Sequence, residues 1–311
     1  MEPQVTPEAV RFAVPDHGYF DVRLHQAIER PRDGPLFTLA NGTWELELRR
    51  PQVDRLEYSI AIDGVSGQHT ALEFPGYRAP KWLSAPDPGE PRRIDATTAL
   101  WSPEGTDPRR PLPLLVAHDG TEYATTAQLT RFIAHAIATR RIPPCRVALL
   151  DSPRRDEDYS ASARYATGLA ARLPQLAPAT AVAGIGASLG ALALLHARQR
   201  HPGAFTALFL QSGSYFRHRW DGQESGFPRF ERIARFIGTV LRAGPAATPL
   251  PITLNCGAPE ENLANNRAVA NALRRQGHDV AFNIFRDAHN FIAWRDTFDP
   301  QLTELLARAW G

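Results

Sequence analysis

The sequence predicts an α/β protein with a mainly parallel sheet, helices on both faces of that sheet, and a small β-rich domain at the N-terminus. Residues 36–62 alternate apolar and polar side chains with the period of half-buried strands. Residues 86–91 are rich in proline and favour neither helix nor strand. From residue 112 onward, short apolar runs alternate with helical patterns. We therefore expect residues 1–90 to form the β-rich domain and residues 91–311 the α/β domain.

The β-rich domain is predicted from two strands with clear turn signals beside them. Asn41-Gly42 precedes the run Trp44–Leu48, and Asp63-Gly64 follows the run Leu56–Ile62. Asn-Gly and Asp-Gly are typical of tight hairpin turns. An antiparallel, immunoglobulin-like sandwich is the fold that we expect for this domain.

The α/β domain is predicted from a regular succession of strands and helices. Helical patterns cover residues 126–139, 159–173, 189–201 and 263–276, and a last helix is expected at the C-terminus. Strands are expected at Leu112–His118, Arg146–Asp151, Ala181–Ile185, Phe205–Gln211, Ile252–Asn255 and Val280–Phe285. Such alternation predicts βα units and a parallel sheet covered on both faces.

Composition and charge exclude several classes of partner. The chain has 311 residues, 43% of them hydrophobic, and 35 basic residues stand against 33 acidic ones, which gives a net charge of +2. This nearly equal balance of charges predicts neither a nucleic-acid nor a membrane partner. Cys145 and Cys256 are too few for a disulfide framework and fit a reducing compartment. The first residues form no signal peptide, so we expect a cytoplasmic protein, and no motif indicates a cofactor.

One motif carries the chemistry. Gly186-Ala187-Ser188-Leu189-Gly190 is a Gly-x-Ser-x-Gly sequence between an apolar strand and an alanine- and leucine-rich helix. This setting is typical of a nucleophile elbow, a strained turn that needs glycine where neighbouring backbones approach closely. A serine that only shapes a turn is the alternative. We expect Ser188 to be the nucleophile of an enzyme with the α/β-hydrolase fold.

A serine hydroxyl needs a general base, and His289 is the expected one. It follows the strand that ends at Phe285, and it comes last in chain order, as this fold requires. His278 precedes the same strand, whereas His196 and His201 lie on the helix after Ser188. We therefore expect those three histidines to be packing or surface residues.

The base needs a carboxylate that orients its imidazole, and this acid should follow the strand Ile252–Asn255. Glu260 and Glu261 both stand there. Glu260 is preferred, because Glu261 is placed to begin the next helix, where its charge favours the helix dipole. Asp287, two residues before the histidine, is expected to cap a helix or loop.

The oxyanion of the reaction needs two backbone N–H donors. The N–H of Leu189 is the first candidate, because it begins the helix after the nucleophile. The second should come from the loop His118-Asp119-Gly120-Thr121-Glu122, where Gly120 permits a sharp turn. The N–H of Thr121 and that of Glu122 are both candidates, and the sequence leaves the choice between them open.

Four parts of the sequence point to a family: Gly186–Gly190 with Leu210–Tyr215, Leu115–Gly120, Cys256–Glu260, and Ala288–Asn290 with Trp294-Arg295. In these parts the chain resembles the esterase family that includes the enterochelin (ferric siderophore) esterases. The likeness spans residues 112–310 and implies hydrolysis of a carboxylic ester through an acyl-enzyme, without a protein-bound metal, since any iron would belong to the substrate. His118 stands where the family usually has an apolar residue, and Asn290 where the enterochelin enzymes tend to have aspartate.

The substrate is predicted less sharply than the reaction. Residues 217–242 contain six arginines against three acidic residues, and such a segment could attract an anionic ester such as a ferric siderophore. A solvated, arginine-rich helix is the alternative. Arg217 and Trp220 are the candidate substrate-binding residues. An acyltransferase and a non-catalytic binding protein are the alternative functions, and the oligomeric state is left open.

Overall fold

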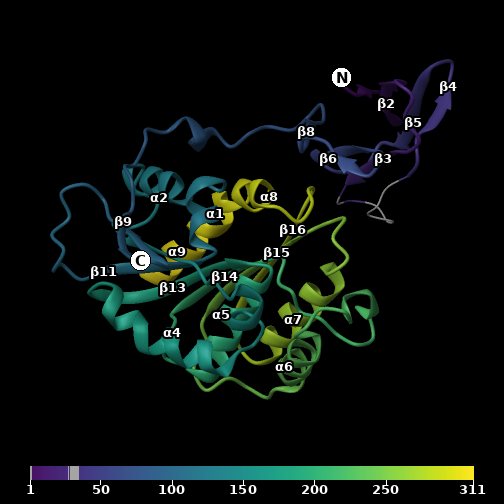
Figure 1. Ribbon diagram of the computed structural model, residues 1–311. Helices are drawn as coiled ribbons and strands as arrows, with labels where there is room; N and C mark the ends of the chain where they lie inside the picture. Colours follow the sequence, from purple (N-terminus) through teal and green to yellow (C-terminus); the bar gives the residue numbers. More distant parts are fainter. Residues whose placement is uncertain (1, 27, 29–34) are drawn as a thin grey trace. The chain divides into compact units, whose positions relative to one another are not determined.

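The computed structural model describes residues 2–26, 28 and 35–311 (Figure 1). By its contacts the chain divides into two compact units. The smaller unit comprises the chain up to Arg78 together with Gly257–Glu260 and Phe285–His289. The larger unit comprises Ala79–Cys256, Glu261–Ile284 and Asn290–Gly311.

Residues 79–90 group with the larger unit, although the sequence assigns them to the β-rich domain. The short 3₁₀ helix η1 (Lys81–Ser84) explains this grouping. Its Trp82 is only 3% exposed and packs edge-on against Phe132, with 5.2 Å between the ring centroids. Arg131 also donates a hydrogen bond to the Leu83 carbonyl.

The smaller unit contains two antiparallel sheets that share one apolar core. The first has the strand order β1-β2-β5-β4, and the second the order β3-β6-β7, with β8 also paired to β6. Val10 and Phe12 of the first sheet and Leu24 and Leu56 of the second are buried in this core, whereas Arg11 between the first two is exposed. The strands are β1 (Gln4–Val5), β2 (Ala9–Pro15), β3 (Val22–Gln26), β4 (Thr38–Ala40), β5 (Thr43–Arg49), β6 (Arg55–Ile62), β7 (Val65–Ser66) and β8 (Thr70–Glu73).

The larger unit is built on an eight-stranded, mostly parallel sheet with the order β16-β15-β14-β13-β11-β12-β10-β9. From β12 through β15 the neighbouring strands pair in parallel, and β10 joins β12 and β9 antiparallel. The strands are β9 (Arg92–Asp95), β10 (Thr98–Trp101), β11 (Leu112–His118), β12 (Arg146–Leu150), β13 (Ala179–Ala187), β14 (Ala207–Gln211), β15 (Pro251–Gly257) and β16 (Asp279–Phe285).

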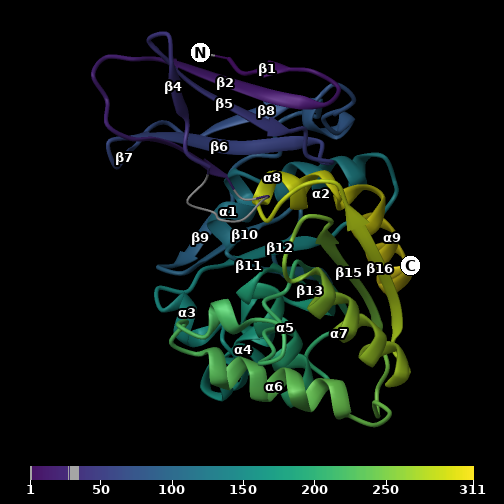
Figure 2. The ribbon, with the colours of Figure 1, turned by 90° about the vertical axis from the view of Figure 1, so that its right-hand side faces the viewer.

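Helices cover both faces of this sheet, as the sequence predicts. In Figure 2, α1, α2, α8 and α9 lie above the sheet and α3 to α7 below it. The helices are α1 (Gly120–Thr125), α2 (Leu129–Ala138), α3 (Arg155–Asp158), α4 (Ala163–Leu176), α5 (Leu189–Arg200), α6 (Phe230–Arg242), α7 (Leu263–Arg275), α8 (Phe291–Asp296) and α9 (Thr303–Trp310), with the short helices η2 (Gly222–Glu224) and η3 (Phe298–Leu302).

The central strands lie between these helices and are apolar on both faces. All five residues of β14 are buried, and so are all residues of β11 except Pro113. Burial on both faces removes the period-two alternation that marks the strands of the smaller unit. None of the helices in residues 2–26, 28 and 35–311 is long and apolar enough to cross a membrane.

Candidate active site

Ser188 occupies a strained turn between β13 and α5. Its backbone has φ 54° and ψ −122°, a conformation that residues other than glycine rarely adopt. The turn requires glycines on either side: a Cβ at Gly186 would lie 2.7 Å from the carbonyl carbon of Gly190, and one at Gly190 would lie 3.1 Å from Cβ of His118. The Gly-x-Ser-x-Gly sequence thus forms the strand-turn-helix geometry that was expected of it.

The turn is tied to the neighbouring strand β14. The N–H of Ser188 donates to the carbonyl oxygen of Gln211 at 2.9 Å, and the N–H of Ser214 donates to the carbonyl oxygen of Ser188 at 3.1 Å. The Oγ atoms of Ser188 and Ser214 lie 3.0 Å apart, within hydrogen-bonding distance. Sequence reasoning missed Ser214 as a site residue, although it follows the end of the strand next to the one that precedes Ser188.

A network of buried polar side chains holds the end of β14, the strand to which this turn is hydrogen-bonded. The hydroxyl of Tyr123 donates to Oε1 of Gln211 at 2.8 Å, and Nε2 of Gln211 donates to the carbonyl oxygen of Trp294 at 3.0 Å. Nε1 of Trp294 in turn donates to Oγ of Ser212 at 2.9 Å. Burial raises the pKa of Tyr123 well above its usual value, so its hydroxyl stays a donor. The network connects α1, β14 and α8.

Glu260 and His289 form a pair. Oε2 of Glu260 accepts a hydrogen bond from Nδ1 of His289 at 2.6 Å, and Oε1 accepts from the N–H of Gly257 at 2.7 Å. The Glu260 side chain is 3% exposed, and that of His289 is 39% exposed. A carboxylate held in this way fixes one imidazole tautomer, with the proton on Nδ1 and a lone pair on Nε2. Of the two glutamates that the sequence left as candidates, Glu260 is the one paired with His289.

Each residue of this pair comes shortly after the end of a strand of the sheet. Glu260 comes three residues after β15, and His289 comes four residues after β16. Ser188 follows β13, which is parallel to β14, and β14 is parallel to β15. In sheets of this kind, catalytic and binding residues gather beyond the carboxyl ends of the strands.

The backbone N–H groups of Thr121 and Glu122, in the loop after β11, differ in whether they are free to bind an oxyanion. The N–H of Thr121 donates to Oδ1 of Asp151 at 3.0 Å, and its hydroxyl donates to Oδ2 of the same carboxylate at 2.6 Å. An amide already directed at a carboxylate is poorly placed to bind an oxyanion, because the two anions repel each other. Of the two amides that the sequence proposed in this loop, the geometry favours that of Glu122, while Leu189 begins α5 as expected.

The side chains of His118 and Asp119 hold this loop through hydrogen bonds to neighbouring elements. Nδ1 of His118 lies 3.1 Å from the carbonyl oxygen of Gly190, and Nε2 lies 2.9 Å from the hydroxyl of Tyr165. Complete burial lowers the pKa of His118 to about 4, so its imidazole is neutral. Arg155 forms two hydrogen bonds with the Asp119 carboxylate, at 2.7 and 2.8 Å. His118 therefore connects the loop after β11 to the helix that follows Ser188.

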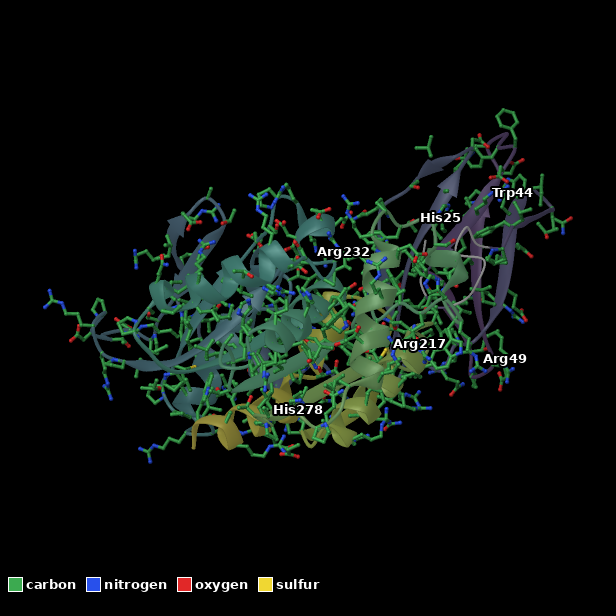
Figure 3. The ribbon with its side chains drawn as sticks, turned by 90° about the horizontal axis from the view of Figure 1, so that it is seen from below. His25, Trp44, Arg49, Arg217, Arg232 and His278 are labelled. Carbon is green, nitrogen blue, oxygen red and sulfur yellow. The ribbon has the colours of Figure 1, made fainter. Side chains whose placement is uncertain are left out.

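Two arginines of the arginine-rich segment form ion pairs within the protein, and a third lies over an aromatic ring. Arg217 lies over the ring of Trp220, with Cζ 4.2 Å from the ring centroid, and Trp220 is 41% exposed. Arg232 donates to Glu157 at 2.7 Å, and Arg229 pairs with the same carboxylate. Both Arg217 and Arg232 are labelled in Figure 3. Arg229 and Arg232 thus serve as structural ion-pair partners, and the half-buried Arg217 and the exposed Trp220 remain the candidates for ligand contact.

Two of the other histidines have structural contacts. The N–H of Leu250 donates to Nδ1 of His278 at 3.2 Å. His278, labelled in Figure 3, lies just before β16. His196 packs edge-on against Phe236, with 4.8 Å between the ring centroids. Within the part of the chain that the structure describes, no group of three or more His, Cys, Asp or Glu side chains is placed to hold a metal ion.

Comparison with known proteins identifies the family. Residues 94–305 match the family described as "Putative esterase". The chain belongs to this family. No curated protein sequence matches the chain.

Solved structures of esterases share this fold. The enterochelin esterase of Shigella flexneri has a TM-score of 0.76 and 18% identity, with 98% of this chain and 94% of that chain covered. The ferric enterobactin esterase of Salmonella typhimurium has a TM-score of 0.76 and 16% identity, over 98% of this chain and 96% of that chain. A Shigella flexneri enterobactin esterase crystallised in the presence of enterobactin has a TM-score of 0.73 and 18% identity, over 99% and 95%. At these identities the likeness establishes the fold alone.

Proposed function

We propose that this member of the esterase family is a serine carboxylic-ester hydrolase in which Ser188, His289 and Glu260 act as a catalytic triad. The observation that carries the proposal is the 2.6 Å pair between His289 and the buried Glu260. The strained turn at Ser188 and the chain order serine, acid, histidine support it. Membership of the family supports ester hydrolysis itself.

The proposed reaction has two halves. Oγ of Ser188 attacks the ester carbonyl carbon while Nε2 of His289 takes its proton, and Glu260 stabilises the imidazolium that forms. The N–H groups of Leu189 and Glu122 bind the oxyanion. Collapse of the tetrahedral intermediate expels the alcohol, which takes the proton from His289 and leaves an acyl-enzyme on Ser188. Water, activated by the same imidazole, then releases the acid and restores the serine.

The proposal also covers the fold type of each unit. We assign the larger unit to the α/β-hydrolase type and the strands of the smaller unit, β1 to β8, to an immunoglobulin-like sandwich. A mostly parallel sheet covered on both faces supports the first assignment, and two four-stranded antiparallel sheets with a shared core support the second.

A ferric siderophore ester is the proposed substrate class. Solved relatives were crystallised with enterobactin or with 2,3-dihydroxy-N-benzoyl-glycine. Such catecholate ligands are aromatic and anionic, and Arg217 stacked on the exposed Trp220 offers a cation beside an aromatic ring. Only this pair in the arginine-rich segment is nominated for substrate contact.

The test is hydrolysis of a short p-nitrophenyl ester by the wild type, by Ser188→Ala, and by Ser66→Ala as an exposed control serine. Ser188→Ala should lose about 10³-fold or more in kcat/KM with an unchanged circular dichroism spectrum, while the control stays active. Retained turnover by Ser188→Ala would reject the proposal. Cleavage of a ferric trilactone siderophore under the same conditions tests the substrate class separately.

A further inference from the structure

The loop that carries His289 is held by the N-terminal part of the chain. By its contacts, Phe285–His289 groups with the unit formed by the first 78 residues. The N–H of Asp54, just before β6, donates to the carbonyl oxygen of Arg286 at 2.6 Å. Nε of Arg286 donates back to Oδ1 of Asp54 at 3.2 Å. The backbone hydrogen bond therefore holds Arg286, three residues before His289, against the start of β6, and the exposed side-chain pair adds little to it.

A buried charge makes a second attachment next to the first. Nη1 of Arg55, the first residue of β6, lies 3.5 Å from Oδ2 of Asp287, and the two residues are 5% and 6% exposed. Oδ1 of Asp287 accepts from the N–H of Ala288 at 2.7 Å. Nη2 of Arg55 lies 3.4 Å from Glu57, and its guanidinium lies over the ring of Tyr77. Asp287, expected from the sequence only to cap a helix or loop, is thus the anionic partner of a buried arginine.

Burial of a charged pair is costly unless geometry compensates for it. An exposed pair such as Arg11 with Glu47, on β2 and β5 of the same unit, carries no such cost and orders little. Arg55 with Asp287 is held away from water, and one partner lies two residues from His289. The contact is electrostatic, since Nη1 of Arg55 has no hydrogen-bond partner. Breaking it leaves an uncompensated charge in a low-dielectric site, which is costly.

We propose that Arg55 is a positioning residue for His289, so that the N-terminal unit takes part in the reaction by setting the angle of the imidazole toward Glu260. The inference rests on the function proposed above. It assigns to the β-rich unit a role in catalysis that needs no contact with substrate. Loss of Arg55 frees the Asp287 segment to shift, and a shift of about 1 Å in a catalytic group costs up to about 100-fold in rate.

The experiment compares Arg55→Met, which keeps the apolar stem, with Arg55→Lys, which keeps the charge, and with Arg11→Met as the exposed control. We expect Arg55→Met to lower kcat on the p-nitrophenyl ester at least tenfold with KM nearly unchanged, Arg55→Lys to recover part of the loss, and Arg11→Met to behave as the wild type. The far-downfield proton signal of His289 Nδ1–H, identified by its absence from His289→Ala, should shift or broaden only in the Arg55 variants.

Asp287→Asn provides a second route if Arg55→Met does not fold. It should lower kcat in the same way, and the double variant should lose less than the sum of the two single losses. Wild-type kcat together with an unshifted His289 signal in the folded Arg55 or Asp287 variants would overturn the positioning role. A failure of the proposed function is distinguishable, because then Ser188→Ala and His289→Ala would themselves retain activity.

Discussion

At the scale of single residues, Glu260 is fixed by its own turn before it meets His289. One carboxylate oxygen accepts the N–H of Gly257 and the other faces Nδ1 of His289, so rotation of the carboxylate would break both contacts. Glu261, the next residue in the chain, is exposed. The two glutamates therefore form a matched pair of positions for mutation.

Glu260→Gln should lower kcat by about 10³- to 10⁴-fold, because the amide cannot stabilise an imidazolium and offers a donor in place of an acceptor. Glu261→Gln, its control, should change kcat less than about threefold. Steady-state kinetics on a p-nitrophenyl ester measure both. Equal losses in the two variants would mean that Glu260 has no special role.

At the scale of elements, the turn at Ser188 depends on a close approach between the end of β13 and the start of α5. Gly186→Ala would place a methyl group 2.7 Å from the backbone of Gly190, where no flexible side chain can yield. Gly168 lies in α4, is exposed, and has nothing within 4 Å of an added Cβ. Glycine to alanine thus adds a methyl group to a crowded site at Gly186 and to an open one at Gly168.

We expect Gly186→Ala to destabilise the protein by about 1–3 kcal/mol through overpacking and to lower activity. Gly168→Ala should stabilise it by about 0.5–1 kcal/mol, because alanine favours the helix more than glycine does. Urea unfolding of both variants checks the signs. A neutral Gly186→Ala would show that the turn tolerates a Cβ.

Elements with a strong apolar pattern were predictable from the sequence, and those set by tertiary contacts were not. The strand Leu112–His118 has the predicted bounds, and α5 ends one residue before its prediction. β9 was missed because it is exposed at every residue and has no apolar period. β10 was missed because it is only 4 residues long, too short for a pattern to stand out. In the same way, chain order pointed to Glu260 and His289, whereas the engagement of Thr121 by Asp151 depends on how two loops meet in space.

At the scale of the whole molecule, His118 makes the stability of the fold depend on pH. Its pKa of about 4 in the folded protein lies below the ordinary value of 6.5, because the ring is fully buried between the Gly190 carbonyl and Tyr165. The unfolded chain takes up this proton below pH 6.5, and the folded protein does so only near pH 4. Stability contributed by the neutral ring is therefore complete above pH 6.5 and is lost as the pH falls toward 4.

The free energy of unfolding should fall by up to about 3 kcal/mol from this residue alone between pH 7 and pH 4. His118→Gln, which cannot take up the proton, should show a flatter dependence over that range, even if it is less stable at pH 7. Chemical denaturation at several pH values gives both curves. Parallel curves for the wild type and the variant would show that His118 does not drive acid unfolding.

The central claim, that Ser188 is the nucleophile, is tested most directly by the site of covalent labelling with a fluorophosphonate. The wild type should gain one adduct, which peptide mass spectrometry places on Ser188, and His289→Ala should react much more slowly because no base takes the serine proton. Ser188→Ala should gain none. An adduct on another residue, or no adduct in a wild-type enzyme that still hydrolyses esters, would contradict the claim.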